Sequence, residues 1–331
     1  MAYDIFVCDK IPSHYKDKVD ALLKECSLRN EEDAEYNVLV FDDSSELIAC
    51  GALKGNILKQ IAVSPAAEGE GLCATVVTEL ISIAVNRGIT QLFLFTKPKH
   101  KQLFMSLGFY PIIVTQDILM MENRPGGLEA FLRTVPHYSG RVGAVVCNCN
   151  PFTLGHRKLI EQAAAQTDHL LVFVLSEEQP MFPAEDRLAL VRDGTADLEN
   201  VTVVSGGKYM ISRATFPTYF IKEECRCQSA SCELDVRLFA ERIAPALNIS
   251  VRFVGEEPFD PITREYNEML KALLPLYNIE LIEVPRFGGI SATAVRRMIR
   301  EGRISETKDS LPEVTYEYCK RRFTAGSEFS R

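Results

Sequence analysis

One stretch of this 331-residue chain, Val142–Ala164, constrains the fold more than any other. It begins with a short apolar run, Val142–Cys147, of the kind that parallel sheets bury, and asparagine and proline residues end that run. A helix follows, because Leu159, Ile160 and Ala163 recur on one face while charged residues lie mostly off it. A strand, a tight turn and a helix in this order predict a unit of a doubly wound α/β domain.

The start of that helix has the chemistry of an anion-binding site. A helix N-terminus presents unpaired N–H groups and about half a positive charge. Thr153 adds a hydroxyl group, and Gly155 lets a phosphate approach the backbone. His156 can donate a hydrogen bond to an oxygen that gains charge during a reaction. Taken alone, these residues also fit a simpler interpretation, a helix cap followed by a surface histidine.

A second polar segment, Ile290–Arg296, follows a glycine pair and enters another helix. Ser291 and Thr293 supply hydroxyl groups at the start of this helix, and the Arg296 guanidinium can bind phosphate oxygens as a fork. Each of these residues alone could be an ordinary cap or surface residue. The two segments together, in this order and a domain's length apart, indicate one phosphate site.

Both segments resemble signatures of the nucleotidyltransferase superfamily, whose members bind a nucleoside triphosphate and attack its α-phosphate. The first resembles (His/Thr)-x-Gly-His and the second resembles Ile-Ser-x-Thr-x-x-Arg. The resemblance implies catalytic roles for Thr153, His156 and Arg296, with ATP and Mg²⁺ as cofactors; the metal ligands stay open. The residues it assigns to ATP are Asn150, Phe152, Thr153, Gly155, His156, Arg187, Ser291, Thr293 and Arg296.

Other polar residues near predicted strand ends are candidates for the same site. Arg187, at the start of a helix, is expected either on a phosphate or in solvent as an ordinary surface charge. Lys208 and Arg213 follow a predicted strand and are pocket candidates. The carboxylates of Glu256 and Glu257 are expected in solvent, although they could also hold Mg²⁺ through water.

The second half of the chain alternates strands with helices, as a doubly wound parallel sheet requires. Ligands of such sheets bind beyond the carboxyl ends of the strands, which is where both signatures fall. The predicted strands are Val142–Cys147, His169–Leu175, Val201–Ser205, Ser250–Val254 and Ile279–Val284.

The first part of the chain has a different pattern. Its predicted strands are Asn37–Phe41, Leu47–Leu53, Ile57–Val63 and Gln91–Phe95. A loop with Gly69 and Gly71 follows the third strand and leads into a helix that begins near Leu72 and has one apolar face. This loop is a second candidate anion site, although the glycines also fit an ordinary turn.

This part resembles the GNAT acetyltransferase fold, in which such a loop holds the pyrophosphate of acetyl-CoA. The residues that this implies for a CoA-like arm are Val63, Gly69, Gly71 and Leu72. The chain departs from the family at Ala66, where Gln or Arg is usual, and at Phe104, where many members carry a tyrosine acid. Because a phenyl ring cannot donate a proton, we expect this domain to bind or present a CoA-like group, with acetyl transfer of its own less favoured.

The predicted fold class is α/β with two domains. Residues 1–125 form a GNAT-like α+β domain, residues 126–140 a linker, and residues 141–331 a doubly wound, Rossmann-like nucleotidyltransferase domain. The net charge of −8 and the lack of a long basic block argue against nucleic acid as a partner. The sequence shows neither a secretory signal nor an apolar run of membrane-spanning length, so a cytoplasmic location without membrane contact is expected.

Ten cysteines are many for such a chain, but they are scattered. Without a secretion signal they are interpreted as reduced thiols. The one cluster, Cys225, Cys227 and Cys232, lacks Cys-x-x-Cys spacing and a nearby histidine, which makes a zinc site an unfavoured interpretation. Its role stays open.

The order of the two parts is the most specific resemblance. A GNAT-like half ahead of a Thr-x-Gly-His nucleotidyltransferase half is similar to the citrate lyase ligase family, as are residues 208–220 and 254–263. The resemblance implies an AMP-forming acid–thiol ligase. It would use ATP and acetate, by way of acetyl-AMP, to acetylate the thiol of a dephospho-CoA-type prosthetic group on the acyl carrier subunit of the citrate lyase complex. Pyrophosphate and AMP would be released and the lyase activated.

Two other functions remain open at this point. One is a cofactor-biosynthetic adenylyltransferase of the phosphopantetheine or nicotinamide-mononucleotide type, which would transfer AMP to a phosphate acceptor. The other is a non-catalytic module that senses a nucleotide or CoA. The sequence leaves the carboxylate preference, the docking surface of the carrier and the oligomeric state undetermined.

Overall fold

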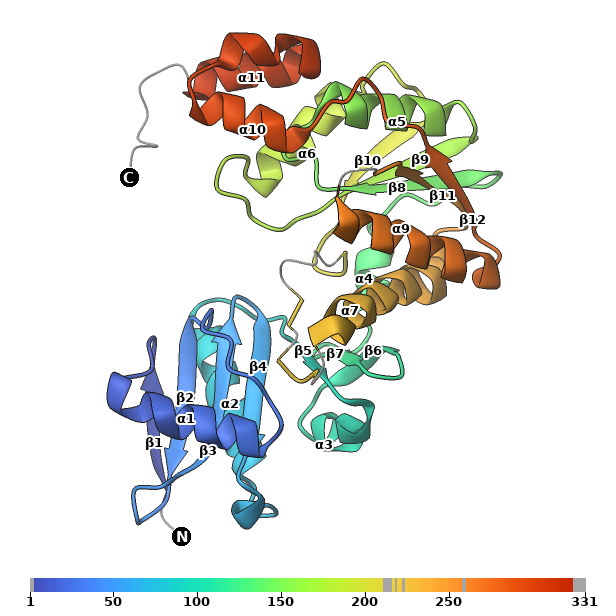
Figure 1. Cartoon of the computed structure of the whole chain (residues 1–331). Helices are drawn as coiled ribbons and strands as arrows, with labels where there is room; N and C mark the ends of the chain where they lie inside the picture. Colours follow the sequence, from blue (N-terminus) through green and yellow to red (C-terminus); the bar gives the residue numbers. More distant parts are fainter. Residues whose placement is uncertain (1–2, 211–215, 218, 222–223, 258–259, 324–331) are drawn as a thin grey trace. The chain divides into compact units, whose positions relative to one another are not determined.

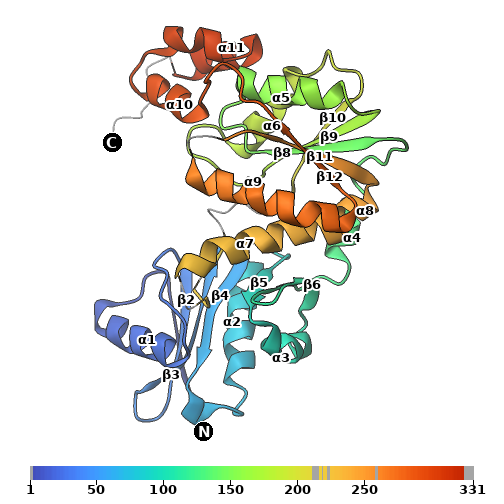
Figure 2. The ribbon, with the colours of Figure 1, turned by 45° about the vertical axis from the view of Figure 1, so that its right-hand side comes forward.

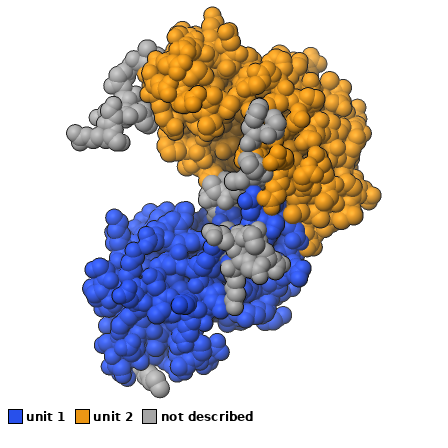
Figure 3. Space-filling view, viewed as in Figure 1, with its two compact units in different colours: residues 1–128, 216–234 blue, residues 129–215, 235–331 orange. Residues whose placement is uncertain are grey.

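The computed structural model describes residues 3–210, 216–217, 219–221, 224–257 and 260–323, and it divides the chain into two compact units (Figure 3). Unit 1 comprises residues 1–128 and 216–234, and unit 2 comprises residues 129–215 and 235–331. The first division falls within the stretch that the sequence predicts as a linker. A later segment, residues 216–234, also belongs to unit 1, so unit 2 is not continuous in sequence.

Unit 1 is built on a seven-stranded sheet in the order β1-β2-β3-β4-β5-β7-β6 (Figure 1). β4 and β5 pair in parallel, and the other neighbours pair antiparallel. The strands are β1 (Asp4–Cys8), β2 (Tyr36–Phe41), β3 (Leu47–Lys54), β4 (Ile57–Val63), β5 (Phe93–Thr96), β6 (Tyr110–Val114) and β7 (Leu119–Glu122). The helices are α1 (Ser13–Glu25), α2 (Leu72–Asn86) and α3 (Lys101–Ser106).

Strand β2 shows why helices cover both faces of this sheet. Successive strand residues point to opposite faces. Val38 and Val40 belong to the core cluster that contains α2, whereas Leu39 and Phe41 belong to the cluster that contains α1. Each fully buried side chain of this kind stabilises the fold by about 1.5–3 kcal/mol. The strand is therefore apolar at successive positions instead of alternating with polar residues.

The later segment of the chain completes unit 1 next to β5. Strands β4 and β5 pair at their first two residues and show no further pairing within the described residues. The Tyr219 hydroxyl donates a hydrogen bond to the Phe95 carbonyl oxygen (3.1 Å), and the Phe216 ring lies 5.1 Å from the Phe95 ring. Tyr219 is buried in this position. The segment therefore contacts the end of β5, beyond the point where its pairing with β4 stops.

Unit 2 is built on a five-stranded parallel sheet in the order β10-β9-β8-β11-β12 (Figure 2). The strands are β8 (Val142–Cys147), β9 (His169–Val174), β10 (Val201–Ser205), β11 (Ile249–Gly255) and β12 (Glu280–Val284). The strand order reverses between β8 and β11. A reversal of this kind is the point at which doubly wound sheets bind ligands.

Helices cover both faces of this sheet. Buried residues of α5, α6, α10 and α11 share one core cluster with β8, β9 and β11, and both ribbon views show α9 on the other face (Figures 1 and 2). The helices of unit 2 are α5 (Leu154–Ala164), α6 (Ala184–Asp193), α8 (Ala244–Ala246), α9 (Pro261–Leu273), α10 (Ala292–Arg300) and α11 (Glu313–Phe323). Two more helices, α4 (Gly127–Leu132) and α7 (Glu224–Leu238), each contain a point in the sequence where the chain passes from unit 1 to unit 2. The predicted α/β fold class, with a doubly wound parallel sheet in the second half, is confirmed.

None of the helices in the described ranges combines the length and the apolar character needed to cross a lipid bilayer.

Candidate active site

The first predicted segment forms the N-terminus of α5. Thr153 is the N-cap residue, and its hydroxyl oxygen accepts a hydrogen bond from the His156 backbone N–H (3.4 Å). In return the His156 ring nitrogen Nδ1 accepts a hydrogen bond from the Thr153 backbone N–H (3.1 Å). A backbone N–H can only donate, so the proton of a neutral His156 ring lies on Nε2. The cap therefore leaves Nε2–H as the donor of this ring.

The electrostatic surroundings keep His156 uncharged. The pKa of its imidazole is lowered to about 4, chiefly because protein surrounds the ring and also because the Arg286 guanidinium is near. Part of the residue is still reached by solvent. At neutral pH, His156 is thus a neutral hydrogen-bond donor fixed in one orientation.

The second predicted segment forms the N-terminus of α10 and contacts the first. Ser291 is its N-cap residue, and its hydroxyl oxygen accepts a hydrogen bond from the Ala294 backbone N–H (3.3 Å). Arg296 donates one hydrogen bond to the carbonyl oxygen of Asn150 and another to the Thr293 hydroxyl oxygen (2.9 Å). The structure therefore brings the two segments together, with Arg296 as the bridge.

Gly155 lies between these two helix starts. A Cβ atom added at Gly155 would sit 3.6 Å from Thr153 Oγ1 and 3.9 Å from Ile290 Cβ. These are ordinary van der Waals distances, and Gly155 does not have a positive φ angle. The fold itself would accept an alanine here, so a need for glycine at this position would come from a ligand.

Asn150 and Phe152 have different surroundings. The Asn150 amide nitrogen donates to Gln179 Oε1 (3.1 Å), while Asn150 Oδ1 is buried with no hydrogen-bond partner within the described residues. A buried acceptor without a partner costs free energy, and a bound donor or cation would remove that cost. The Phe152 ring is fully buried at 6.4 Å from the His156 ring, so it supports His156 and is not exposed to a nucleotide.

Arg187 differs from both expectations for it. Its side chain is fully buried, and Nε donates to the Phe182 carbonyl oxygen (3.0 Å). Its Nη1 donates to the Asn148 carbonyl oxygen (2.6 Å) and to Asn148 Oδ1 (2.5 Å), and its Nη2 donates to the Glu177 carbonyl oxygen. Arg187 is thus neither a solvated charge nor directed at a phosphate in this arrangement. It fixes the turn after β8 to the loop before α6.

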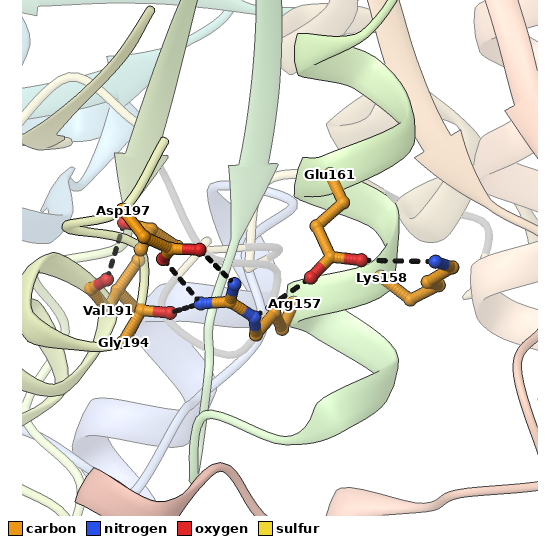
Figure 4. Close-up of polar contacts among 7 residues, drawn as sticks. Arg157, Lys158, Glu161, Val191, Gly194 and Asp197 are labelled. Atoms are coloured by element: carbon orange, nitrogen blue, oxygen red, sulfur yellow. Dashed lines mark hydrogen bonds and ion pairs between the residues drawn. The ribbon is translucent and has the colours of Figure 1, made fainter. Parts of the chain in front are cut away.

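The residue after His156 also has a structural role (Figure 4). Arg157 forms ion pairs with Glu161 (2.9 Å) and Asp197 (2.7 Å) and donates to the Gly194 carbonyl oxygen. Figure 4 shows these contacts, together with the ion pair between Lys158 and Glu161 (3.1 Å). Arg157 therefore anchors the first turn of α5, and with it His156, to the segment that follows α6.

One charged residue near the site, Arg286, was not identified from the sequence. Arg286 follows β12 and forms an ion pair with Glu257 after β11 (2.6 Å). Arg286 also donates to the Ile290 carbonyl oxygen (3.0 Å), directly before Ser291. Glu256 is exposed as expected, whereas Glu257 is only partly exposed, with 22% of its side chain accessible, because it pairs with Arg286. The usable signal is a basic residue two positions after the end of a predicted strand.

Two further pocket candidates from the sequence have no described contact with the two signatures. Lys208 lies in an exposed turn after β10, and Arg213 falls outside the described residues. Among the residues that the structure describes, no three His, Cys, Asp or Glu side chains gather into a metal site. Of the cysteine cluster, Cys227 and Cys232 are buried, and the side chain of Cys225 is outside the described set.

The glycine loop of unit 1 leads into α2 as predicted. Gly69 and Gly71 have φ angles of 90° and 80°, and Gly71 is the N-cap residue of α2. Nothing lies within 4 Å of a Cβ atom added at either glycine. Val63 ends β4 and Leu72 is buried as the first residue of α2. The loop is therefore open, although the carboxylates of Glu68 and Glu70 flank Gly69 and oppose a phosphate there.

Phe104 is buried in the core cluster beside α2 and supplies no acid to this unit.

Unit 2 has the features of the nucleotidyltransferase class. It is a doubly wound sheet, and two capped helix starts, joined by Arg296, lie beside the point where the strand order reverses.

Comparisons with known proteins narrow this class. A family model described as "Citrate lyase ligase C-terminal domain" matches residues 142–319. The citrate (pro-3S)-lyase ligase of Klebsiella pneumoniae is 41% identical over 315 residues, which cover 92% of this chain and 92% of that protein. The protein of the same name from Escherichia coli K12 is 39% identical over 316 residues, which cover 92% of this chain and 90% of that protein. The chain belongs to the citrate lyase ligase family.

A solved structure, Thermotoga maritima TmcAL bound with alpha-thio ATP, aligns with 56% of this chain and 56% of that one. The TM-score is 0.39 and the identity 17%, values too low to support a conclusion about the ligand of this chain.

Proposed function

We propose that this chain activates citrate lyase as an AMP-forming acid–thiol ligase. It acetylates the thiol of the dephospho-CoA-type prosthetic group on the acyl carrier subunit, using acetate and ATP. Full-length relatives at 41% and 39% identity carry the name of this activity. The structural observation that supports it most is the contact of Arg296 with Asn150, which joins two helix N-termini into one cationic site.

The reaction would take place in two displacements. An acetate oxygen bonds to the α-phosphorus of ATP, the bond to the bridging oxygen breaks, and pyrophosphate leaves with the electron pair. The carrier thiol, a few per cent ionised near neutral pH at an ordinary pKa of about 8.5, then bonds to the acetyl carbon. The carbon–oxygen bond to phosphate breaks and AMP leaves. No nucleophile from the protein is required.

The residues of the site would act on the charge that develops in the first displacement. His156 would donate Nε2–H to a phosphate oxygen, and the N–H groups at the starts of α5 and α10 would point at the same anion. Arg296 would add a second cationic contact. Acetate and the triphosphate are both negatively charged and repel each other. The main role of the protein would therefore be to neutralise the negative charge of the phosphate oxygens.

The fit of Mg²⁺ to this site rests on one protein oxygen. The unpartnered Asn150 Oδ1 is the kind of oxygen that takes a metal-bound water. Mg²⁺ usually keeps several waters and binds through substrate phosphates, so it does not require a cluster of carboxylates. When bound, it would neutralise charge on the phosphate oxygens.

We further propose that unit 1 holds the CoA-like arm of the carrier at Val63, Gly69, Gly71 and Leu72. The open glycine loop at the start of α2 supports this assignment, because no side chain lies within 4 Å of a Cβ atom added at Gly69 or Gly71 and a helix start attracts anions. The arm would deliver its thiol without an acid from Phe104.

One exchange assay tests the proposed function. Labelled pyrophosphate should enter ATP in the presence of Mg²⁺ and acetate alone, and the His156→Ala variant should lose this exchange by about 100-fold or more. With the deacetylated lyase complex added, AMP should form and lyase activity should return. Exchange that requires a phosphate-bearing acceptor instead of acetate would favour a cofactor-making adenylyltransferase. ATP binding without any AMP release would favour a sensor.

A further inference from the structure

Two cysteine sulfur atoms are in contact directly before the candidate ATP site. Cys147 ends β8, and Cys149 lies in the turn that precedes Asn150. The Cys149 thiol donates a hydrogen bond to Cys147 Sγ across 3.1 Å, and both residues are free thiols. A disulfide has an S–S distance of about 2.05 Å, so a movement of roughly 1 Å would bond them.

We propose that Cys147 and Cys149 form a reversible disulfide that weakens ATP binding, a form of regulation that rests on the function proposed above. The oxidant is a peroxide or a small-molecule disulfide. With hydrogen peroxide, the Cys147 sulfur attacks one oxygen, the O–O bond breaks, and water and a sulfenic acid result. The Cys149 sulfur then bonds to Cys147 and releases a second water. Two thiols lose two protons and two electrons, and a dithiol reductant restores them.

Burial assigns the order of these two steps. Cys147 is partly exposed, whereas the side chain of Cys149 is fully buried, so a dissolved oxidant reaches Cys147 first. Burial and the hydrogen bond to Cys147 raise the pKa of the Cys149 thiol well above its usual value. Cys149 therefore stays protonated until the neighbouring sulfur is oxidised, and then closes the ring.

The turn between the two sulfur atoms connects them to the ATP site. Asn148 lies between the cysteines, and both its carbonyl oxygen and its Oδ1 accept hydrogen bonds from the buried Arg187. The next residue, Asn150, supplies the carbonyl oxygen that Arg296 binds. Cys149 already has a positive φ of 49°, a conformation that few non-glycine residues adopt. Because only Asn148 separates the two cysteines, we expect closure of the disulfide to turn the peptide units on either side of Asn148 and to disturb the contact between the two signatures.

A peptide mass test shows whether the disulfide forms. The full chain is treated with hydrogen peroxide, its remaining thiols are blocked, and it is digested with trypsin without reduction. The tryptic peptide Val142–Arg157 contains Cys147 and Cys149 and no other cysteine. We expect this peptide to lose the mass of two hydrogen atoms and to regain it after treatment with a dithiol.

A binding test on the same samples shows whether the disulfide matters. Calorimetry with ATP and MgCl₂ should give an affinity at least about 5-fold weaker after oxidation, restored by the dithiol. Cys147→Ser and Cys149→Ser should each abolish this response, with Cys147→Ala as a second variant if either folds poorly. Cys73→Ser, which removes a partly exposed thiol in unit 1, is the matched control and should leave the response intact.

The outcomes test the regulatory disulfide of Cys147 and Cys149 separately from the proposed function. A peptide 142–157 that carries two blocking groups after peroxide treatment would overturn the proposed disulfide, as would a disulfide that leaves the ATP affinity unaltered. Reduced protein that binds no ATP would overturn the proposed function as well, and the two results are read from different samples.

Discussion

The chemistry of His156 depends on which of its two ring nitrogens is held by the fold. Nδ1 accepts from the backbone of Thr153, an arrangement that a charged imidazolium could not keep because both of its nitrogens are donors. The cap and the neighbouring Arg286 therefore act in the same direction, and both favour the neutral ring. A neutral donor can stabilise a charge that develops on phosphate while keeping its own proton.

This interpretation predicts a pH dependence of stability. The pKa of His156 is about 4 in the folded chain against about 6.5 when unfolded, so the unfolded chain binds more protons between these values. The stabilisation that arises because the fold keeps the His156 ring neutral is fully present above pH 6.5 and is lost as the pH falls toward 4. Urea unfolding at pH 7 and pH 5 should show a loss about 1–2 kcal/mol larger for the native chain than for His156→Gln. Equal losses in the two proteins would show that His156 titrates normally.

Arg187 should matter for stability more than any surface arginine. Its removal takes the guanidinium donor from the buried carbonyl oxygen of Phe182 and from the half-buried carbonyl oxygen of Asn148. We expect Arg187→Gln to lower the free energy of unfolding by about 2–4 kcal/mol in urea denaturation. The matched control is Arg297→Gln on the exposed side of α10, with an expected change within about 0.5 kcal/mol. A loss confined to ATP affinity, with stability unchanged, would restore Arg187 as a phosphate ligand.

At the scale of elements, the sequence predicts all five strands of unit 2 to within one residue at each end. Apolar runs bounded by polar turns specify such strands locally. The apolar pattern of a single element does not predict which residues of other elements it contacts. The pair of Arg286 with Glu257 requires β11 and β12 to be neighbours, and the burial of Arg187 requires the loop before α6 to fold over the turn after β8. The placement of residues 216–234 in unit 1 has no periodic signal.

The junction of the two helix starts gives a prediction that separates ligand binding from folding. The space around Gly155 accepts a Cβ atom, and alanine is the better helix former by about 0.5–1 kcal/mol. Gly155→Ala should therefore keep or slightly raise the thermal midpoint while ATP affinity falls by about 10-fold or more, since the methyl group would occupy the approach to the backbone amides. Gly194→Ala is the contrasting variant, because its Cβ would lie 2.5 Å from the Phe152 ring and should destabilise the chain. Unchanged ATP affinity in Gly155→Ala would remove this helix start from the nucleotide site.

At the scale of the whole molecule, the proposed reaction divides into two parts that fall in different units. Unit 2 holds every described contact between the two signatures, so adenylation of acetate should depend on unit 2 alone. Delivery of the carrier thiol is the part assigned to unit 1 through its glycine loop. The two steps can be measured separately, because pyrophosphate exchange needs no carrier.

Substitution of Gly71 should therefore separate the two steps. Gly71→Val places a branched side chain at a φ of 80°, at a backbone cost of about 1–3 kcal/mol, and puts that side chain in front of the first amides of α2. Acetate-dependent pyrophosphate exchange should stay at its native rate, while transfer of acetate to the carrier falls by about 10-fold or more. Gly88→Val is the matched control, since Gly88 has a φ of 78° and equally open surroundings just beyond the other end of α2. Because both variants carry the same backbone strain, a loss of transfer in Gly71→Val alone would locate the carrier's arm at this loop, and an equal loss in both would show that unit 1 contributes only stability.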